Sequence, residues 1–138
     1  MAVDVNSLAD IGERSPADVL ELLAKPFRPE VIQTRQIAGR TVSYVPVAAV
    51  VSRLNRAAGS WDWRVVSIST ENMSLTRKGA ATDVPVATVI GSLEIPGLGV
   101  REGVGVHPVE GSEDAGKAAA SDALKRAAAL FGTPLDGG

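Results

Sequence analysis

The chain has 138 residues, of which 45% are hydrophobic and 22% are charged, a balance typical of one globular domain with a single core. It has no cysteine and one histidine, which excludes disulfides, thiol nucleophiles and zinc sites built from thiolates or clustered imidazoles. No apolar run approaches the roughly 20 residues that span a bilayer. The sequence therefore predicts a soluble, cytoplasmic protein that has no membrane partner.

The net charge of −2 conceals a segregation of charge along the chain. Residues 1–21 hold five acids and one base, residues 22–101 hold ten bases and five acids, and residues 102–138 have a local charge of −3. A basic middle between acidic ends is compatible with a phosphate-binding stripe on an otherwise acidic surface. An uneven surface charge without a function explains the same pattern.

The N-terminal part predicts a flexible tail and then a helix. Residues 1–14 show no periodicity, whereas Ser15 followed by Pro16 supplies an N-cap and a first-turn proline. We expect one folded domain over residues 15–135 and a short tail over residues 136–138.

Two strands are predicted next, over residues 31–38 and 41–45, with a tight turn at positions 39 and 40. In that register Arg35 lies directly across from Tyr44, and moving the turn back by one residue makes the two diagonal neighbours on the same face. A cation beside an aromatic ring is a plausible nucleotide-binding platform. An ordinary surface pair is the alternative.

The middle of the chain predicts a helix and a meander of strands. Residues 46–58 carry an apolar stripe, with Arg53 and Arg56 on the other side of the helix. The strands are expected over residues 61–71, 84–95 and 98–107. A turn-rich, basic interruption with a mobile tip is expected over residues 72–82.

The last strand of this meander has two different faces. One face carries Leu98, Val100, Val104 and Val106, and the other carries Gly99, Arg101, Gly103, Gly105 and His107. A face of glycines lets another segment approach the backbone closely. That segment is either a helix of the same fold, which we favour, or a ligand.

A long helix is predicted from an N-cap at Ser112 to a stop at Gly132. Its inward stripe is formed by Ala120, Leu124, Ala127 and Phe131. The many alanines allow this helix to lie close against a sheet.

Cations follow one line of the same helix. Lys117, Ser121 and Lys125 are spaced four residues apart, and Arg126 follows four residues after Asp122, which suits an ion pair. These cations either bind an anion or form an ordinary solvated helix face.

The start of this helix imitates a phosphate-binding loop. Residues 111–117 match G-x-x-x-x-G-K, but Ala118 replaces the hydroxyl residue that would bind magnesium. Glu113 and Asp114 would also repel phosphates. His107 has no evident nucleophile to serve, and no serine elbow or zinc motif is present, so we predict no catalytic residue, no metal and no cofactor.

A series of motifs runs through residues 18–135. In chain order they are Arg35 near Gly39, Val42-Ser-Tyr44-Val, Leu54-Asn55 with Gly59 and Trp63, Arg101-Glu102-Gly-Val-Gly105, and Lys117 through Ser121-Asp-Ala-Leu-Lys125-Arg126-Ala to Leu130-Phe131-Gly132. Together they resemble the Rad52 superfamily of single-strand annealing proteins. The helix signature is the specific part, and the bacterial DdrA and phage Sak branches look most similar.

The resemblance implies an α+β fold in which an antiparallel sheet, made of a hairpin and a three-stranded meander, packs on the long C-terminal helix. It also implies protomers assembled into a ring or partial ring, with single-stranded DNA in a positively charged groove. Carried onto this sequence, the DNA-binding residues are Arg35, Tyr44, Lys117, Lys125 and Arg126, with Arg101, Arg77 and Lys78 as further candidates.

Two positions depart from the family pattern. Ala129 stands where many relatives have a base, and His107 stands where a small residue is often found. The resemblance therefore implies a groove that is less positive near Ala129.

The expected function is ATP-independent binding of single-stranded DNA and annealing of complementary strands in homologous recombination and DNA repair. Neutralising phosphates and exposing base edges suffices for annealing, so no catalytic group is required. The alternatives are a binder that protects DNA ends but anneals poorly, a nucleotide-hydrolysing enzyme that uses Lys117, and a purely structural oligomerisation module. The expected partners are single-stranded DNA, further copies of the chain, and a recombinase or single-strand binding protein.

Overall fold

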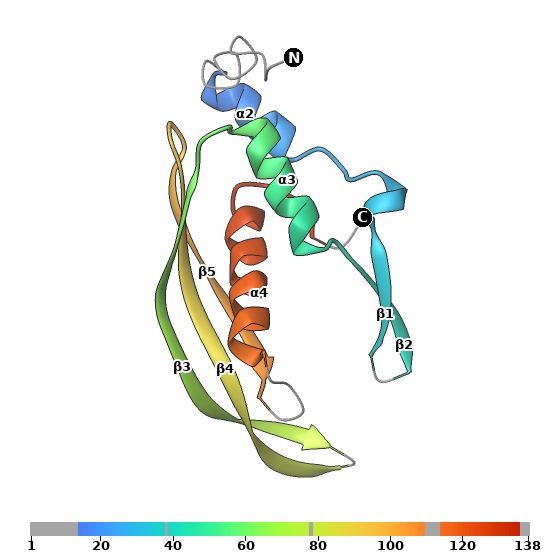
Figure 1. Ribbon diagram of the computed structural model, residues 1–138. Helices are drawn as coiled ribbons and strands as arrows, with labels where there is room; N and C mark the ends of the chain where they lie inside the picture. The colour runs from blue at the N-terminus through green and yellow to red at the C-terminus, as the bar shows by residue number, and fades with distance from the viewer. Residues whose placement is uncertain (1–13, 38, 78, 110–113, 136–138) are drawn as a thin grey trace.

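The structure is a computed structural model that describes residues 14–37, 39–77, 79–109 and 114–135 (Figure 1). Its elements are α2 (Pro16–Leu23), the 3₁₀ turn η1 (Pro29–Val31), β1 (Gln33–Ile37), β2 (Arg40–Tyr44), α3 (Val47–Ala57), β3 (Asp62–Arg77), β4 (Ala80–Ile95), β5 (Gly99–Pro108) and α4 (Ala115–Ala129). Strands β3, β4 and β5 form a three-stranded antiparallel sheet, and β1 and β2 form a separate hairpin. The predicted α+β fold is confirmed. The expected tails at residues 1–13 and 136–138 lie outside the described residues.

Helix α4 lies along the inner face of the curved sheet, and the β1–β2 hairpin lies on the other side of that helix (Figure 1). Helices α2 and α3 sit together at one end of the molecule, and the tip of the β3–β4 hairpin lies at the other end. The chain therefore brings α3, α4 and the small hairpin together on one side of the sheet.

Helix α2 begins as the sequence predicts. The side-chain oxygen of Ser15 accepts a hydrogen bond from the backbone N–H of Asp18 at 3.1 Å, and Pro16 is the first helical residue. The serine satisfies one of the N–H groups that a helix start leaves without a partner.

The register of the β1–β2 hairpin differs from the predicted one. Arg35 pairs with Val42, and Tyr44 pairs with Gln33, so Arg35 and Tyr44 are diagonal neighbours and do not face each other directly. Gly39 has a φ of +79° and is the second loop residue, not the first. A glycine adopts this left-handed conformation without the steric cost that other residues meet, which fixes the turn one position earlier than predicted.

The predicted interruption at residues 72–82 is wrong. Strand β3 continues to Arg77 and β4 begins at Ala80, with continuous pairing from Asn72 opposite Pro85 to the end of the hairpin. Ladder hydrogen bonds hold this distal part together, and its side chains are largely exposed on both faces. A strand exposed on both faces has no alternation of apolar and polar residues, so the pattern did not reveal it.

The glycine face of β5 receives α4. A Cβ atom added to Gly103 would lie 2.2 Å from the carbonyl oxygen of Ala123, and one added to Gly105 would lie 2.0 Å from that of Ala119. Two glycines thus allow the helix backbone to approach the strand more closely than any side chain permits. The favoured prediction, a helix of the same fold against this face, is confirmed.

The main core forms where α2, α3 and α4 meet the sheet. Its fully buried side chains include Leu23, Leu54 and Leu93, and Phe131 closes it at the end of α4. Trp63 packs against this core and against a second, alanine-rich cluster beneath α4.

Helix α4 is shorter than predicted at its start. It begins at Ala115, with Asp114 in the N-cap position, whereas the expected N-cap Ser112 lies outside the described residues. The chain reverses after the helix at Gly132, which has a φ of +108°. Leu124, Ala127 and Phe131 of the predicted inward stripe are buried, whereas Ala120 is only partly buried and its neighbour Ala119 is buried in its place.

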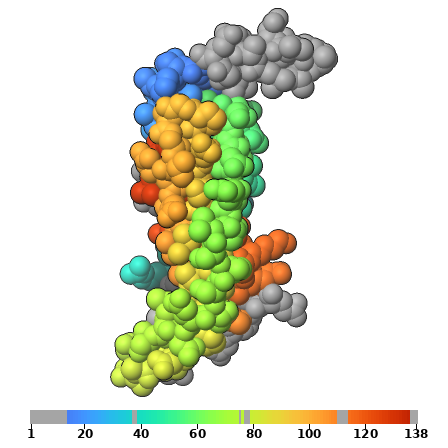
Figure 2. Space-filling view, turned by 90° about the vertical axis from the view of Figure 1, so that its left-hand side faces the viewer, coloured from blue at the N-terminus to red at the C-terminus, as the bar shows by residue number. Residues whose placement is uncertain are grey.

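Figure 2 shows the outer face of the sheet, which no other described element covers. The exposed large apolar side chains that β5 presents on this face are Val100, Val104 and Val106. Among the described helices, none is long and apolar enough to cross a membrane.

Candidate nucleic-acid interface

Tyr44 is the centre of a cluster formed by the small hairpin and α4. The guanidinium carbon of Arg35 lies 5.1 Å from the centroid of the Tyr44 ring, and the Nζ of Lys125 lies 5.5 Å from it. The Tyr44 hydroxyl donates a hydrogen bond to the side-chain oxygen of Gln33 at 2.8 Å. Both cations are within the range of cation–π attraction, so the ring holds two positive groups from elements far apart in the sequence.

Lys125 links α4 to the end of β2. Its Nζ donates a hydrogen bond to the backbone oxygen of Val45 at 3.1 Å, and its side chain is half-buried. Burial is the main cause that lowers the pKa of Lys125; Asp122 raises it in part, while Arg35 and Arg126 lower it further. Positive charges therefore crowd together here, and a bound anion would relieve their repulsion.

Arg126 is held as the sequence predicts. Its Nε lies 3.0 Å from a carboxylate oxygen of Asp122, and 61% of its side chain is exposed. Because an exposed pair of this kind contributes little to stability, its effect is mainly to orient the guanidinium.

Arg35, Lys125 and Arg126 line one cavity of about 350 Å³ between β1, α3, β5 and α4. We call it the groove cavity. Its lining consists of Arg35, Val47, Val106, His107, Ala118, Ser121, Asp122, Lys125 and Arg126. The structure thus brings Arg35, Lys125 and Arg126 together, with Tyr44 beside them.

His107, which was not among the predicted DNA-binding residues, is also part of this lining. It ends the face of β5 that carries Gly103 and Gly105, the face on which α4 lies. That shared face was a signal in the sequence, because a residue two positions after a helix-facing glycine points to the same side of the strand. Ser121 joins the lining for the corresponding reason on α4.

Lys117 does not line the groove cavity. It is exposed on α4, two positions beyond the helix start. It lies on the same line of the helix as Ser121 and Lys125, about 12 Å from the latter along the axis.

The three further candidates are not part of this cluster. Arg101 lies over the ring of Phe131, with its guanidinium carbon 5.3 Å from the ring centroid, and it donates a hydrogen bond to the backbone oxygen of Val100. The backbone of Arg77 ends β3 at the far tip of the long hairpin, and Lys78 lies outside the described residues. Arg101 therefore does not line the groove cavity, because its side chain packs at the opposite end of α4, and its predicted contact with DNA stays a prediction.

A comparison with known protein families shows to which family the chain belongs. Residues 15–136 match the family described as "Rad52/22 family double-strand break repair protein". The chain belongs to this family. No curated protein matches the sequence.

Rad52/22 family proteins are non-catalytic annealing proteins, so membership of the family implies no catalytic site. Among the described residues, no group of histidine or acidic side chains could hold a metal ion. Family membership implies a part in DNA repair and recombination, with binding and annealing of single-stranded DNA as the general activity. It sets aside the alternative of a nucleotide-hydrolysing enzyme built on Lys117.

Proposed function

We propose that this protein binds single-stranded DNA in the groove cavity and anneals complementary strands without ATP. The main support for the proposal is that Arg35 and Lys125 both lie over the ring of Tyr44, with Arg126 beside them in the same cavity. Cations flanking an aromatic ring combine the two features with which proteins hold single strands, phosphate neutralisation and a face on which a base stacks.

The mechanism needs only binding. Arg35, Lys125 and Arg126 neutralise phosphates, which lowers the repulsion between two approaching strands. Contacts to phosphates carry no information on base identity, so the protein accepts any sequence. Base edges that remain free then pair with the complementary strand.

We further propose that several copies act together in a ring or partial ring. One protomer offers only a few cations in the groove cavity, and so few phosphate contacts give only a weak affinity for DNA. Linked copies raise the effective concentration of each further site. The assignment to the branch of the bacterial DdrA and phage Sak proteins is part of the same proposal, as is a recombinase or single-strand binding protein as a partner.

The alternative within the same chemistry is a protein that coats and protects single-stranded ends but anneals poorly. It would use the same cluster around Tyr44. Annealing of two labelled complementary oligonucleotides, followed by energy transfer, distinguishes the two functions because both require binding and only one accelerates pairing.

The decisive variant is Lys125→Ala with Arg126→Ala. We expect the affinity for a labelled oligonucleotide to fall at least about tenfold at low salt, and the slope of affinity against salt to become shallower, because two phosphate contacts are lost. The matched control is Lys25→Ala with Arg64→Ala, which removes two exposed cations outside the groove cavity.

Circular dichroism must show that both double variants are folded. Equal affinity of the groove variant and the wild type at every salt concentration would mean that DNA does not bind in this cavity. A wild-type protein that neither binds a long oligonucleotide nor assembles beyond a monomer would overturn the proposal.

A further inference from the structure

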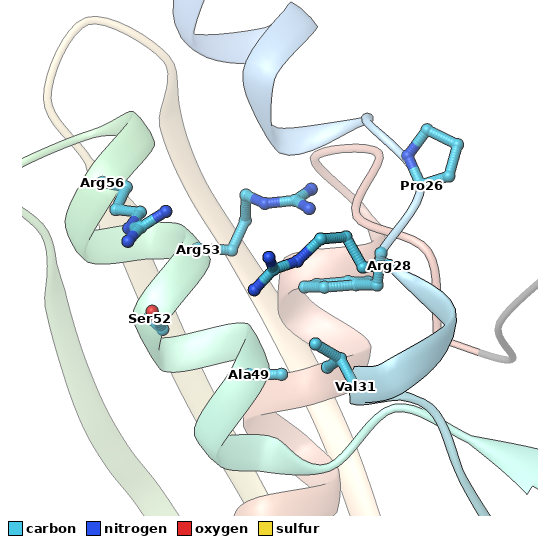
Figure 3. A pocket seen from close by; sticks show the side chains of 8 residues that line it. Pro26, Arg28, Val31, Ala49, Ser52, Arg53 and Arg56 are labelled. Atoms are coloured by element: carbon cyan, nitrogen blue, oxygen red, sulfur yellow. The ribbon is translucent and has the colours of Figure 1, made fainter.

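A second basic cavity lies between α3 and the segment that follows α2, and it shares no residue with the groove cavity. Its volume is about 200 Å³. We call it the arginine pocket, and it is lined by Pro26, Phe27, Arg28, Val31, Ala49, Ser52, Arg53 and Arg56. In Figure 3 the side chain of Arg28 points across the pocket toward α3, from which Arg53 and Arg56 project.

Arg53 is fixed in this pocket by the end of α2. Its Nη1 donates hydrogen bonds to the backbone oxygens of Leu22, Leu23 and Lys25, at 3.2, 3.3 and 2.6 Å. Its guanidinium carbon lies 4.1 Å from the centroid of the Phe27 ring. The prediction that Arg53 simply projects from the far side of its helix is therefore incomplete, because the side chain caps α2 and covers an aromatic face.

The pocket has an excess of positive charge. Burial first, and then the charge of Arg56, lowers the pKa of Arg53. Within the described part of the chain, no carboxylate forms a salt bridge with Arg28, Arg53 or Arg56. Arg14 and Lys25 line an adjoining cavity of about 310 Å³ together with Arg53 and Arg56. An anion placed among these groups would relieve their mutual repulsion.

Apart from the three arginines and Ser52, the lining is apolar, and this favours one kind of anion. Val31 and Ala49 face each other in the pocket, with Pro26 at its rim (Figure 3). Phe27 is the one aromatic ring of the lining, and Arg53, which its hydrogen bonds to the end of α2 hold in place, lies 4.1 Å from the ring centroid, closer than either cation lies to Tyr44 (5.1 and 5.5 Å). A volume of 200 Å³ is below the roughly 300–1,000 Å³ of small-molecule sites. Single side chains of a peptide suit a pocket of this size.

We propose that the arginine pocket binds an acidic segment of a partner protein. Carboxylates of that segment pair with Arg28 and Arg56, and an apolar side chain beside them contacts Val31 and Ala49. Guanidinium groups bind carboxylates through two parallel hydrogen bonds, which adds geometric selectivity to the charge attraction.

The same helix carries both binding regions. Val47, at the start of α3, lines the groove cavity, and Arg56, near its end, lines the arginine pocket. Arg56 lies nine positions after Val47, which is about 14 Å along the helix axis. A partner bound in the pocket therefore lies next to the DNA without occupying its groove.

The test uses a short fluorescent peptide of several aspartates and two leucines, and measures its anisotropy with the full chain at low salt. We expect Arg28→Ala with Arg56→Ala to weaken peptide binding at least about tenfold, since hydrogen bonds to charged groups are strong. Arg53 stays unchanged because it caps α2. The matched control is the groove variant Lys125→Ala with Arg126→Ala, which should bind the peptide as the wild type does.

Oligonucleotide binding provides the reciprocal measurement. The pocket variant should keep its affinity for single-stranded DNA, which makes a failure of this proposal distinguishable from a failure of the DNA-binding groove. A peptide with serines in place of leucines should bind more weakly, because the apolar contact is lost.

Several outcomes would overturn the proposal. The first is that the wild type does not bind the peptide, and the second is that the pocket variant binds the peptide as tightly as the wild type does. The third is that the serine peptide binds as tightly as the leucine peptide, which would indicate a general anion site. Loss of oligonucleotide affinity in the pocket variant would instead make the pocket a second DNA contact.

Discussion

The two faces of β5 invert the usual relation between hydrophobicity and burial. On the inner face Gly103 and Gly105 are buried under α4, whereas on the outer face Val104 and Val106 remain 49% and 43% exposed. The inner face is buried because glycine lets a helix backbone approach, not because its side chains are apolar. The outer face shows that apolar residues on a strand stay exposed when no element of their own chain packs on them.

The comparison matters for function because the cations of the proposed DNA groove, Arg35, Lys125 and Arg126, lie on the side of the sheet that α4 covers. Close packing on the glycines sets the position of α4, and α4 in turn carries Lys125 to the ring of Tyr44. The strongest tests therefore alter the inner side, and the weakest alter the outer face.

The largest effect is expected for Gly105→Ala. The new methyl group would lie 2.0 Å from a backbone oxygen of α4, so the helix must move away from the strand. We expect the free energy of unfolding to fall by about 3 kcal/mol or more, the upper part of the range for overpacked cores. Urea denaturation measures it, and a change below about 0.5 kcal/mol would contradict the tight packing.

The next largest effect is expected for Tyr44→Leu, on DNA affinity. Loss of a stacking face costs about 1–3 kcal/mol per base, so the affinity for a labelled oligonucleotide should fall about 5- to 150-fold. Tyr44→Phe keeps the ring and loses only the hydrogen bond to Gln33, and it should bind within about twofold of the wild type. If both variants bind equally poorly, the hydroxyl and not the ring face contacts DNA.

A smaller effect is expected from the titration of Lys125. Its pKa lies below the ordinary lysine value, so between the two values the unfolded chain binds more protons than the folded one. The contribution of this group to stability therefore rises with pH through that alkaline window. Urea denaturation of the wild type and of Lys125→Gln across this window checks the sign, because the variant should lack this rise. If the stability of the variant rises with pH by the same amount, the rise comes from a titrating group other than Lys125.

The smallest effect is expected on the outer face. Val104→Thr replaces a half-exposed valine by a residue of similar shape that also favours strands, and the unfolding free energy of the isolated chain should change by less than about 0.5 kcal/mol. Thermal unfolding at low protein concentration measures it. A decrease in the free energy of unfolding as large as that expected for Gly105→Ala would show that Val104 is buried, and the two faces of β5 would then not differ in burial.

Much of the fold was predictable from local signals. Ser15 and Pro16 start α2 where expected, Pro96-Gly97 makes the turn before β5, with a hydrogen bond from the N–H of Leu98 to the oxygen of Ile95, and the Asp122–Arg126 pair forms. These features depend on neighbours within four residues, so the sequence contains all the information that they need.

Other features could not be read in this way. The extension of β3 to Arg77 rests on backbone pairing between residues without an apolar pattern, and the exact hairpin register rests on which loop position Gly39 occupies. Arg101 is part of a family motif but packs over Phe131, because it lies near the start of β5, whereas the groove residues Val106 and His107 lie near the end of that strand.

The sequence by itself determined the class of fold, the face of β5 that α4 covers, and four of the residues that gather at the candidate groove, Arg35, Tyr44, Lys125 and Arg126. Only the tertiary structure decided that His107 joins them, that Lys117 and Arg101 do not line the cavity, and that Arg28, Arg53 and Arg56 form a pocket of their own. The physical reason is distance along the chain: periodicity and capping report on contacts within a few residues, whereas both cavities are made by segments that meet only after α3 and α4 have packed on the sheet.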